Sequence, residues 1–217
     1  SGKADKTVYP RVTERVYDWF VRAGVDPNVI VYSRDIEAGH AMPTLKYGNP
    51  CNEAGKAPWM SACNYDGAGE VLMHIYTEFN PPDPVASLNP PEPVTSATGK
   101  LIEFEQADFV EPRPLNKEDL AKRTGLNEFG YAYVPKACQG SRECRIHVVF
   151  HGCRQVYDKD PGGREIGKGG VAFGLQMVLH AGYNEWANTN RIIVLYPQIQ
   201  KTDANPYGCF DWWGYGE

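Results

Sequence analysis

The sequence predicts an α/β fold in which a mainly parallel sheet carries helices on both faces. Two observations support this prediction. Short apolar runs of strand length alternate with segments of helical spacing, and the most apolar run, 146–150, stops at His151-Gly152. A chain of 217 residues can bury a sizeable core. We therefore expect a single domain over 1–217, with a proline-rich surface linker at about 80–98.

The first part of the chain predicts two helices, one strand and a loop closed by cysteines. Apolar residues recur at helical spacing over 10–23, with proline at the start and glycine just past the end. The apolar run 29–33 predicts a short buried strand. A loop bracketed by cysteines follows over 51–63, and 66–76 shows the helical pattern again.

After the linker the pattern alternates between strands and helices. Each apolar run is four to eight residues long, as expected for strands in a covered sheet. The predicted strands are 101–105, 131–135, 145–150 and 191–196, and the predicted helices are 117–123 and 173–187.

The charge of the chain argues against nucleic acid as a partner. The formal net charge is -5, and no cluster of lysine and arginine exceeds what a solvated surface carries. No apolar stretch is long enough to cross a bilayer, so we expect no membrane partner. The residues after Ser1 show no signal-peptide pattern.

Six cysteines, an even number, predict disulfide bonds and an oxidising compartment. They group as Cys51 with Cys63, Cys138 with Cys144, and Cys153 with Cys209. We therefore expect a secreted or periplasmic protein. A metal site is the alternative, but the spacings of zinc motifs are absent, and His147 and His151 have no third ligand nearby in the sequence.

The end of the 145–150 strand is a candidate oxyanion hole. Gly152 permits a sharp turn, after which the backbone amide of Cys153 could point at a developing negative charge. An ordinary strand-to-loop turn is the alternative interpretation. A bridge from Cys153 to Cys209 would stiffen this turn and hold Trp212 beside it, where an exposed indole could bind apolar substrate. Core packing is the alternative for Trp212 or its neighbour Trp213.

A histidine and an aspartate in the first part of the chain are candidate catalytic residues. His40 lies in a loop flanked by glycine and proline after an apolar run, so that its imidazole could be a general base or simply solvated. Asp5 could be a helix-entry cap. The order of an acid followed by a histidine instead fits the orienting and proton-transferring members of a catalytic triad.

The nucleophile of such a triad is missing from the sequence. Serine occurs at six positions, and none lies in the Gly-x-Ser-x-Gly turn that presents a nucleophile in hydrolases of this kind. The six serines are Ser1, Ser33, Ser61, Ser87, Ser96 and Ser141.

Several segments in combination resemble one enzyme family. They are 2–8, His40-x-x-Pro43-Thr44, 49–51, 61–69, 151–153, Gly182-Tyr183-Asn184-x-Trp186-Ala187, 195–198 and Asn205-Pro206-x-Gly208-Cys209-x-Asp211-Trp212. Together they resemble the poly(3-hydroxybutyrate) depolymerases, most closely the single-domain, circularly permuted type. The resemblance covers nearly the whole chain except the linker and 109–127.

This resemblance implies an α/β-hydrolase fold with a rotated order of segments. The nucleophile comes first, then the acid and the histidine, and the oxyanion strand last. By position Asp5 matches the triad acid, His40 the general base, Cys153 the amide donor of the oxyanion hole, and Trp212 a residue of the substrate crevice. The three cysteine pairs match the bridges of the family. The serine elbow would lie upstream of Ser1, so that the fold is expected to be incomplete at both ends.

The resemblance predicts a fragment of a secreted serine-type polyester depolymerase that hydrolyses short-chain hydroxyalkanoate esters without metal or cofactor. The nucleophile would come from a missing N-terminal segment or a separate chain, and the 217-residue chain alone is expected to be inactive. Two alternatives remain. One is a carboxylesterase of the same superfamily acting on feruloyl or acetyl polysaccharide esters, and the other is a non-catalytic module that binds a polymer.

Overall fold

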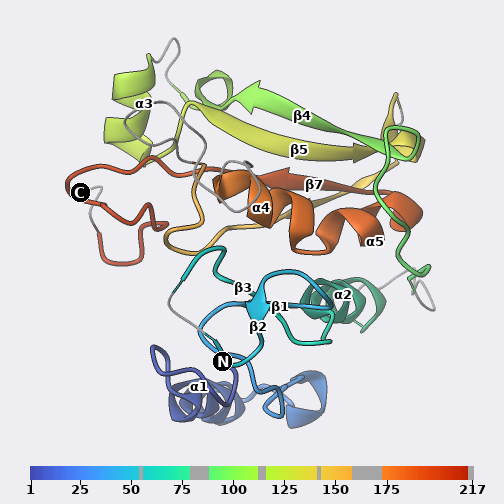
Figure 1. Ribbon diagram of the computed structural model, residues 1–217, viewed down its shortest axis with the longest axis vertical. Coiled ribbons are helices and arrows are strands. Elements are labelled where there is room, and N and C mark those ends of the chain that lie inside the picture. Colours follow the sequence, from blue (N-terminus) through green and yellow to red (C-terminus); the bar gives the residue numbers. More distant parts are fainter. Residues whose placement is uncertain (54–55, 79–87, 112–115, 141–142, 158–172, 215–217) are drawn as a thin grey trace. The chain divides into compact units, whose positions relative to one another are not determined.

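The computed structural model describes residues 1–53, 56–78, 88–111, 116–140, 143–157 and 173–214 (Figure 1). The chain divides into two compact units, Ser1–Ser87 and Leu88–Glu217, and each is described by itself. The boundary falls inside the proline-rich stretch at 80–98, of which 80–87 lies outside the described residues. The single domain over 1–217 stays a prediction.

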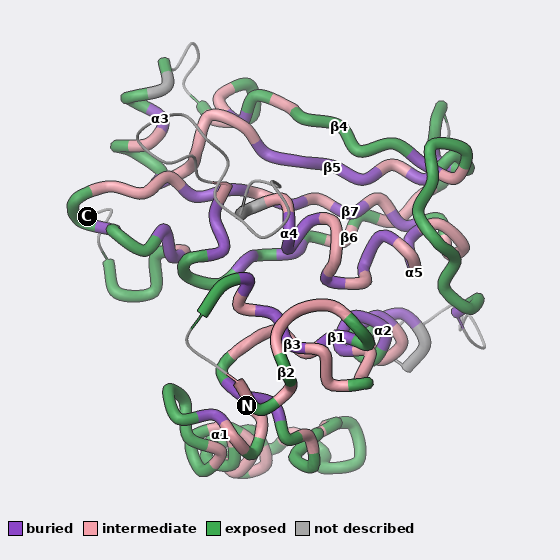
Figure 2. The backbone as a smooth tube through the Cα atoms, in the orientation of Figure 1, coloured by how far each residue is buried: buried purple, intermediate pink, exposed green. Residues whose placement is uncertain are grey.

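The first predicted helix is confirmed as α1, Pro10–Arg22. Proline at the first position suits a helix start, and Gly24 follows the last turn with a φ of 92°. Its apolar side chains, however, are exposed, as Figure 2 shows for most of the helix, and Trp19 is 63% exposed. Apolar spacing predicted the helix correctly because it reports which side chains share a face, not what covers them.

The strand predicted at 29–33 is wrong. A 3-10 helix, η1, occupies Pro27–Val29, and its first turn is capped by the Asp26 carboxylate, which accepts from the backbone N–H of Asn28. The described backbone from 30 to 41 forms no strand. Local side-chain hydrogen bonding with proline at the first helical position favours the tight turn over an extended segment.

A small parallel sheet follows in the first unit. Its strands are β1 (Met42–Thr44), β2 (Asn49–Pro50) and β3 (Met60–Ala62), in the order β1-β3-β2. The helix predicted at 66–76 is confirmed as α2, Gly67–Met73, which continues as the π-helix η2, His74–Glu78.

The second unit is built on a four-stranded sheet with the order β4-β5-β7-β6. All four predicted strands are present, and Figure 2 labels each of them. β6 and β7 are parallel, whereas β5 pairs antiparallel with both β4 and β7, so this sheet is mixed. The α/β class is as predicted. The strands are β4 (Gly99–Glu105), β5 (Phe129–Pro135), β6 (Arg145–Val148) and β7 (Ile192–Tyr196).

The helix predicted at 173–187 is two helices. α4 ends at His180 and α5 begins at Tyr183, because Gly182 adopts a φ of 96° that interrupts the helical backbone. The helix predicted at 117–123 is confirmed, with Asn116 as its N-cap and left-handed Gly125 as its C-cap. The helical segments of this unit are η3 (Gln106–Phe109), α3 (Lys117–Thr124), η4 (Lys136–Cys138), α4 (Phe173–His180) and α5 (Tyr183–Asn190).

One face of the sheet is covered by α5. The Tyr196 hydroxyl donates to Asn184 Oδ1 at 2.7 Å, and the Tyr133 hydroxyl donates to Asn188, which ties two strands to the same helix. Figure 2 shows β5 buried along most of its length. The opposite face is open at the edge strand β6, where Ile146 is 61% exposed. β6 is therefore less covered than the apolar run 146–150 led us to expect.

The described part of the linker is held against α5 without regular structure. The backbone N–H of Asn89 donates to Asn190 Oδ1 at 2.7 Å, and its side-chain amide donates to the carbonyl of Thr189. The Glu92 N–H donates to the carbonyl of Glu185 at 3.1 Å. These bonds fix the path of an otherwise exposed segment.

The three predicted disulfides are confirmed. They join Cys51 to Cys63, Cys138 to Cys144, and Cys153 to Cys209. The first lies in the unit Ser1–Ser87, and the other two lie in Leu88–Glu217.

The two bridges of the second unit should differ in their contribution to stability. Cysteines 56 residues apart close a longer loop than cysteines 6 apart, so chain entropy predicts a loss of about 4 kcal/mol for Cys153→Ser/Cys209→Ser and about 2 kcal/mol for Cys138→Ser/Cys144→Ser. Urea denaturation of the two double variants measures this difference. Equal losses would contradict the loop-length argument.

Candidate active site

The Asp5 carboxylate is buried in a turn made by the residues that follow it. Its side chain is 4% exposed, and Oδ1 accepts the backbone N–H groups of Thr7 and Val8, each at 2.9 Å. Such side-chain-to-backbone bonds are typical of aspartate before a helix. The carboxylate closes the turn 5–8 and does not cap α1, whose N-cap residue is Tyr9, so the helix-entry cap that the sequence allowed for Asp5 is wrong. The turn uses only one of the two carboxylate oxygens.

The second oxygen holds a histidine. Asp5 Oδ2 lies 3.0 Å from Nδ1 of His40, although the two residues are 35 positions apart. An ionised carboxylate only accepts hydrogen bonds, so Nδ1 carries the proton. In the neutral imidazole Nε2 then keeps its lone pair, and the His40 side chain is 49% exposed. This arrangement is that of a general base oriented by an acid.

The electrostatic surroundings keep Asp5 ionised. Burial alone would raise its pKa, but the hydrogen bonds from His40, Val8 and Thr7 outweigh burial and hold the pKa below its usual value. The carboxylate is therefore charged at neutral pH and can hold the imidazole in one tautomer.

Backbone pairing brings the two residues together. The N–H groups of Lys3 and Ala4 donate to the carbonyls of Ile36 and Ala38. Gly2 permits this approach, because a Cβ at its position would overlap the carbonyl oxygen of Ala38.

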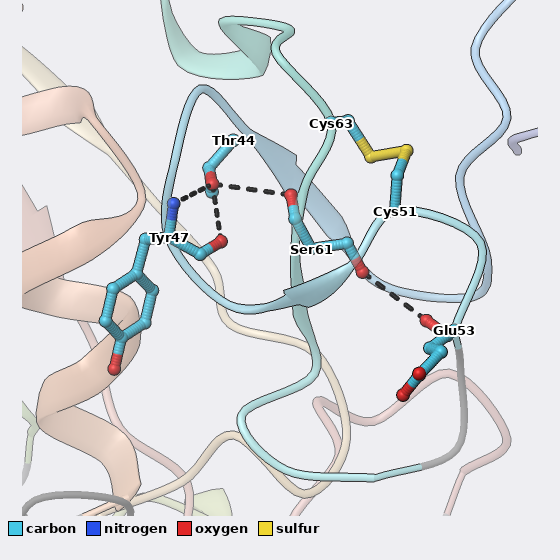
Figure 3. The surroundings of a disulfide bond; sticks show 6 residues. All are labelled: Thr44, Tyr47, Cys51, Glu53, Ser61 and Cys63. Carbon is cyan, nitrogen blue, oxygen red and sulfur yellow. Dashed lines mark hydrogen bonds between the residues drawn. A yellow bond between two sulfur atoms is a disulfide. The ribbon is translucent and has the colours of Figure 1, made fainter.

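The Cys51–Cys63 bridge supports the other side of the His40 loop. The Gly39 N–H donates to the Cys51 carbonyl at 2.9 Å. Figure 3 shows the bridge beside the Thr44 hydroxyl, which donates to the carbonyls of Tyr47 and Ser61. The loop is therefore fixed by covalent and hydrogen bonds close to the point where the chain enters β1.

The turn after β6 carries the predicted oxyanion donor. The Gly152 N–H donates to Gln155 Oε1 at 2.7 Å, and the Gly152 carbonyl accepts the Gln155 N–H at 3.2 Å. Among the residues that the structure describes, none accepts a hydrogen bond from the Cys153 N–H. Cys153 is itself exposed.

His151 is buried behind this turn. Nδ1 lies 2.8 Å from the Gly152 carbonyl oxygen, and Nε2 accepts the Ile199 N–H at 3.3 Å. Burial lowers the pKa of His151, and the bond to Gly152 opposes this shift only in part. The imidazole is therefore neutral at neutral pH.

The bridge from Cys153 ends on a second fixed segment. The Asn205 side chain bonds both the N–H and the carbonyl of Cys209, at 2.9 and 2.8 Å. Trp212 follows and is 78% exposed, with its ring edge-on to Trp213 at 4.9 Å between centroids. The core-packing alternative is therefore wrong for Trp212, which is free to contact an apolar ligand.

The structure brings together the members of each predicted group. Asp5 and His40 meet within the first unit, whereas Cys153, its bridge and Trp212 belong to the second. The convergence of the two groups around one substrate stays a prediction.

Sequence reasoning missed the residues that hold these groups, chiefly His151, Gln155 and Asn205. The position of His151 beside Gly152 was a signal, but hydrogen-bond partners 48 positions away cannot be read from the sequence.

Two further features bear on cofactors and membranes. Within the described ranges, no group of three or more histidine, cysteine or acidic side chains could hold a metal ion. Among those same residues, no helix combines the length and apolar character that crossing a bilayer requires.

Comparison with known sequences gives two relatives, although no family model matches. The chain is 39% identical over 220 residues to a poly(3-hydroxybutyrate) depolymerase of Delftia acidovorans, which aligns 99% of this chain with 36% of that protein. It is 31% identical over 230 residues to a polyhydroxybutyrate depolymerase of Talaromyces funiculosus, covering 99% of this chain and 57% of that one.

Solved structures give the same result. The crystal structure of the PHB depolymerase from Penicillium funiculosum matches 97% of this chain and 60% of its own, with a TM-score of 0.73 and 30% identity. A PHB depolymerase with a serine replaced by alanine, complexed with R3HB trimer, matches 99% and 62%, with a TM-score of 0.74 and 30% identity. The chain therefore spans less than two thirds of each protein it matches.

These likenesses define the class of the fold, which is of the α/β-hydrolase type. Over nearly its whole length, the chain is similar to poly(3-hydroxybutyrate) depolymerases.

Acid should weaken the first unit through Asp5. Because the folded pKa is lowered, the carboxylate stabilises the fold fully above the unfolded pKa of about 3.9, and this contribution is lost as pH falls through the folded value. We expect the free energy of unfolding to fall below about pH 4, and Asp5→Asn to flatten that fall. Urea denaturation between neutral and acid pH measures both.

The matched control for this experiment is Asp26→Asn, which changes an exposed carboxylate that also accepts a backbone N–H in the same unit. It should keep the acid dependence of the parent chain. Identical pH profiles for Asp5→Asn and the parent would contradict the role assigned to the buried carboxylate.

Proposed function

We propose that this chain belongs to a secreted serine-type depolymerase that hydrolyses poly(3-hydroxybutyrate)-like esters. It supplies the acid, the general base and one oxyanion donor of the catalytic site. The observation that carries the proposal is the Asp5–His40 pair, because it leaves Nε2 of a correctly oriented imidazole able to accept a proton. Kinship to depolymerases, one of them complexed with R3HB trimer, supports the substrate class. Three disulfides support secretion.

The reaction proceeds in two acyl-transfer steps. A serine hydroxyl adds to the ester carbonyl carbon while His40 Nε2 takes its proton, and the tetrahedral oxyanion forms. Collapse breaks the bond to the leaving alcohol oxygen, which receives the proton from His40. Water then adds to the acyl-enzyme with His40 again as base, and the serine leaves as the hydroxyl with the acid as product. Asp5 stabilises the imidazolium in both steps.

The nucleophile belongs to polypeptide that these 217 residues do not include, whether an N-terminal segment or a separate chain. Support comes from the absence of a Gly-x-Ser-x-Gly turn in the sequence and from the extra length of the relatives. Ser61 is an unsuitable substitute, because its side chain is buried and its hydroxyl donates to the Glu53 carbonyl.

The second unit supplies the remaining parts. The outward N–H of Cys153 stabilises the oxyanion, and the exposed indole of Trp212 contacts the apolar backbone of the polyester. The reaction needs no metal or organic cofactor from this chain, since acid, base and amide donors suffice for ester hydrolysis.

Hydrolysis of polymer film distinguishes this function from the two alternatives, a carboxylesterase and a binding module. A polypeptide that joins this chain to a serine-elbow segment should release hydroxybutyrate oligomers from poly(3-hydroxybutyrate) film, whereas the 217-residue chain alone should release none. His40→Ala in the longer polypeptide should lower kcat by about 10² to 10⁴, because general acid and base catalysis is lost. Product release is followed by chromatography.

A histidine of the same unit provides the control: His74→Ala on η2 should retain activity. Turnover by the 217-residue chain that His40→Ala abolishes would contradict the missing nucleophile. Release of ferulate or acetate from polysaccharide without attack on the film would favour a carboxylesterase. Adsorption to the film without any product would favour a binding module.

A further inference from the structure

Both ring nitrogens of the buried His151 have fixed roles. A carbonyl oxygen only accepts, so Nδ1 must carry the proton that it shares with Gly152. A backbone N–H only donates, so Nε2 must present its lone pair to Ile199. The two bonds define one neutral tautomer, with the ring 5% exposed.

The carbonyl that His151 holds belongs to the same peptide group as the Cys153 N–H. A trans peptide is planar, and its C=O and N–H point in opposite directions. Since the Gly152 carbonyl points to a buried imidazole, the Cys153 N–H must point away from it. The exposure of Cys153 and the lack of an acceptor among the described residues agree with this direction.

Gln155 fixes the turn from the other side. Its backbone N–H is a second donor to the Gly152 carbonyl, and its side-chain oxygen accepts the Gly152 N–H. A Cβ on Gly152 would lie 2.9 Å from that oxygen and displace it. The lack of a Cβ on Gly152 therefore leaves room for the Gln155 side-chain oxygen to accept this bond.

We infer that His151 is a positioning residue that orients the Cys153 N–H outward and strengthens it as a hydrogen-bond donor. Donation to the Gly152 carbonyl polarises the peptide group, which makes its N–H more positive. His151 itself does not contact substrate. The inference deepens the proposed function, because it rests on the Cys153 N–H stabilising the oxyanion.

Nuclear magnetic resonance of the 217-residue chain tests the geometry without any need for activity. Nitrogen shifts should show His151 neutral with the proton on Nδ1. The Cys153 amide should exchange with solvent rapidly, and the Gly152 amide slowly, because within the described ranges only the latter has an acceptor. A proton on Nε2, or equal protection of the two amides, would overturn the inference.

Two substitutions of His151 separate the hydrogen bond to Gly152 from the hydrogen bond to Ile199. His151→Asn places an amide N–H near the position of Nδ1 and keeps the bond to Gly152, whereas His151→Gln can reach Ile199 with its oxygen but leaves the Gly152 carbonyl without that donor. Each loses one of two hydrogen bonds, so their stabilities should fall alike. Only His151→Gln should shift the Cys153 amide resonance.

Kinetics of the longer polypeptide with the serine elbow complete the test. His151→Gln should lower kcat by about 10- to 100-fold with KM little changed, less than the roughly 10² to 10³ lost when an oxyanion donor is deleted. His151→Asn should restore most of kcat. Equal kcat in the two variants would overturn the inference. Failure of the unsubstituted polypeptide to hydrolyse any ester would instead reject the proposed function, and the amide measurements would still decide the orientation.

Discussion

The hydrogen bond between Asp5 and His40 sets the requirements that the surrounding structure meets. A carboxylate can be buried only if its charge is compensated, and here two backbone N–H groups and one imidazole N–H do so. Those donors exist because the chain turns directly after Asp5. The turn lies beside His40 because 3–4 pairs with 36–38, and Gly2 permits that contact.

The sequence predicted the features that depend on local pattern or on a small set of chemically distinctive residues. Helix α1 was predictable because proline starts it and apolar residues recur at helical spacing. The disulfides followed from cysteine grouping, and Asp5 and His40 from residue type and order, supported by the family resemblance.

The failures of prediction have two physical reasons: local turns interrupt an expected element, and residues distant in sequence decide which apolar faces are covered. The run 29–33 is as apolar as a strand, yet it has no partner strand in the described residues, and its first residue ends the 3-10 turn that Asp26 caps. The break between α4 and α5 depends on one backbone dihedral at Gly182. Exposure of α1 and β6 could not be foreseen, because periodicity defines an apolar face without supplying its cover.

The Asp5–His40 pair and the turn at Cys153 are stabilised in the same way, although they lie in different units. Both are irregular segments, where no helix or strand ladder fixes the backbone, and in each a disulfide with buried hydrogen bonds takes that role. In each site, a rigid polar group forms its hydrogen bonds to the protein at one end only. The imidazole of His40 is held at Nδ1, and the Gly152–Cys153 peptide is held at its carbonyl. Because imidazole and peptide are rigid and planar, fixing the inner end also directs the outer one. Nε2 and the Cys153 N–H are thereby oriented although no residue in the described ranges forms a hydrogen bond with either of them, which leaves both available to a substrate.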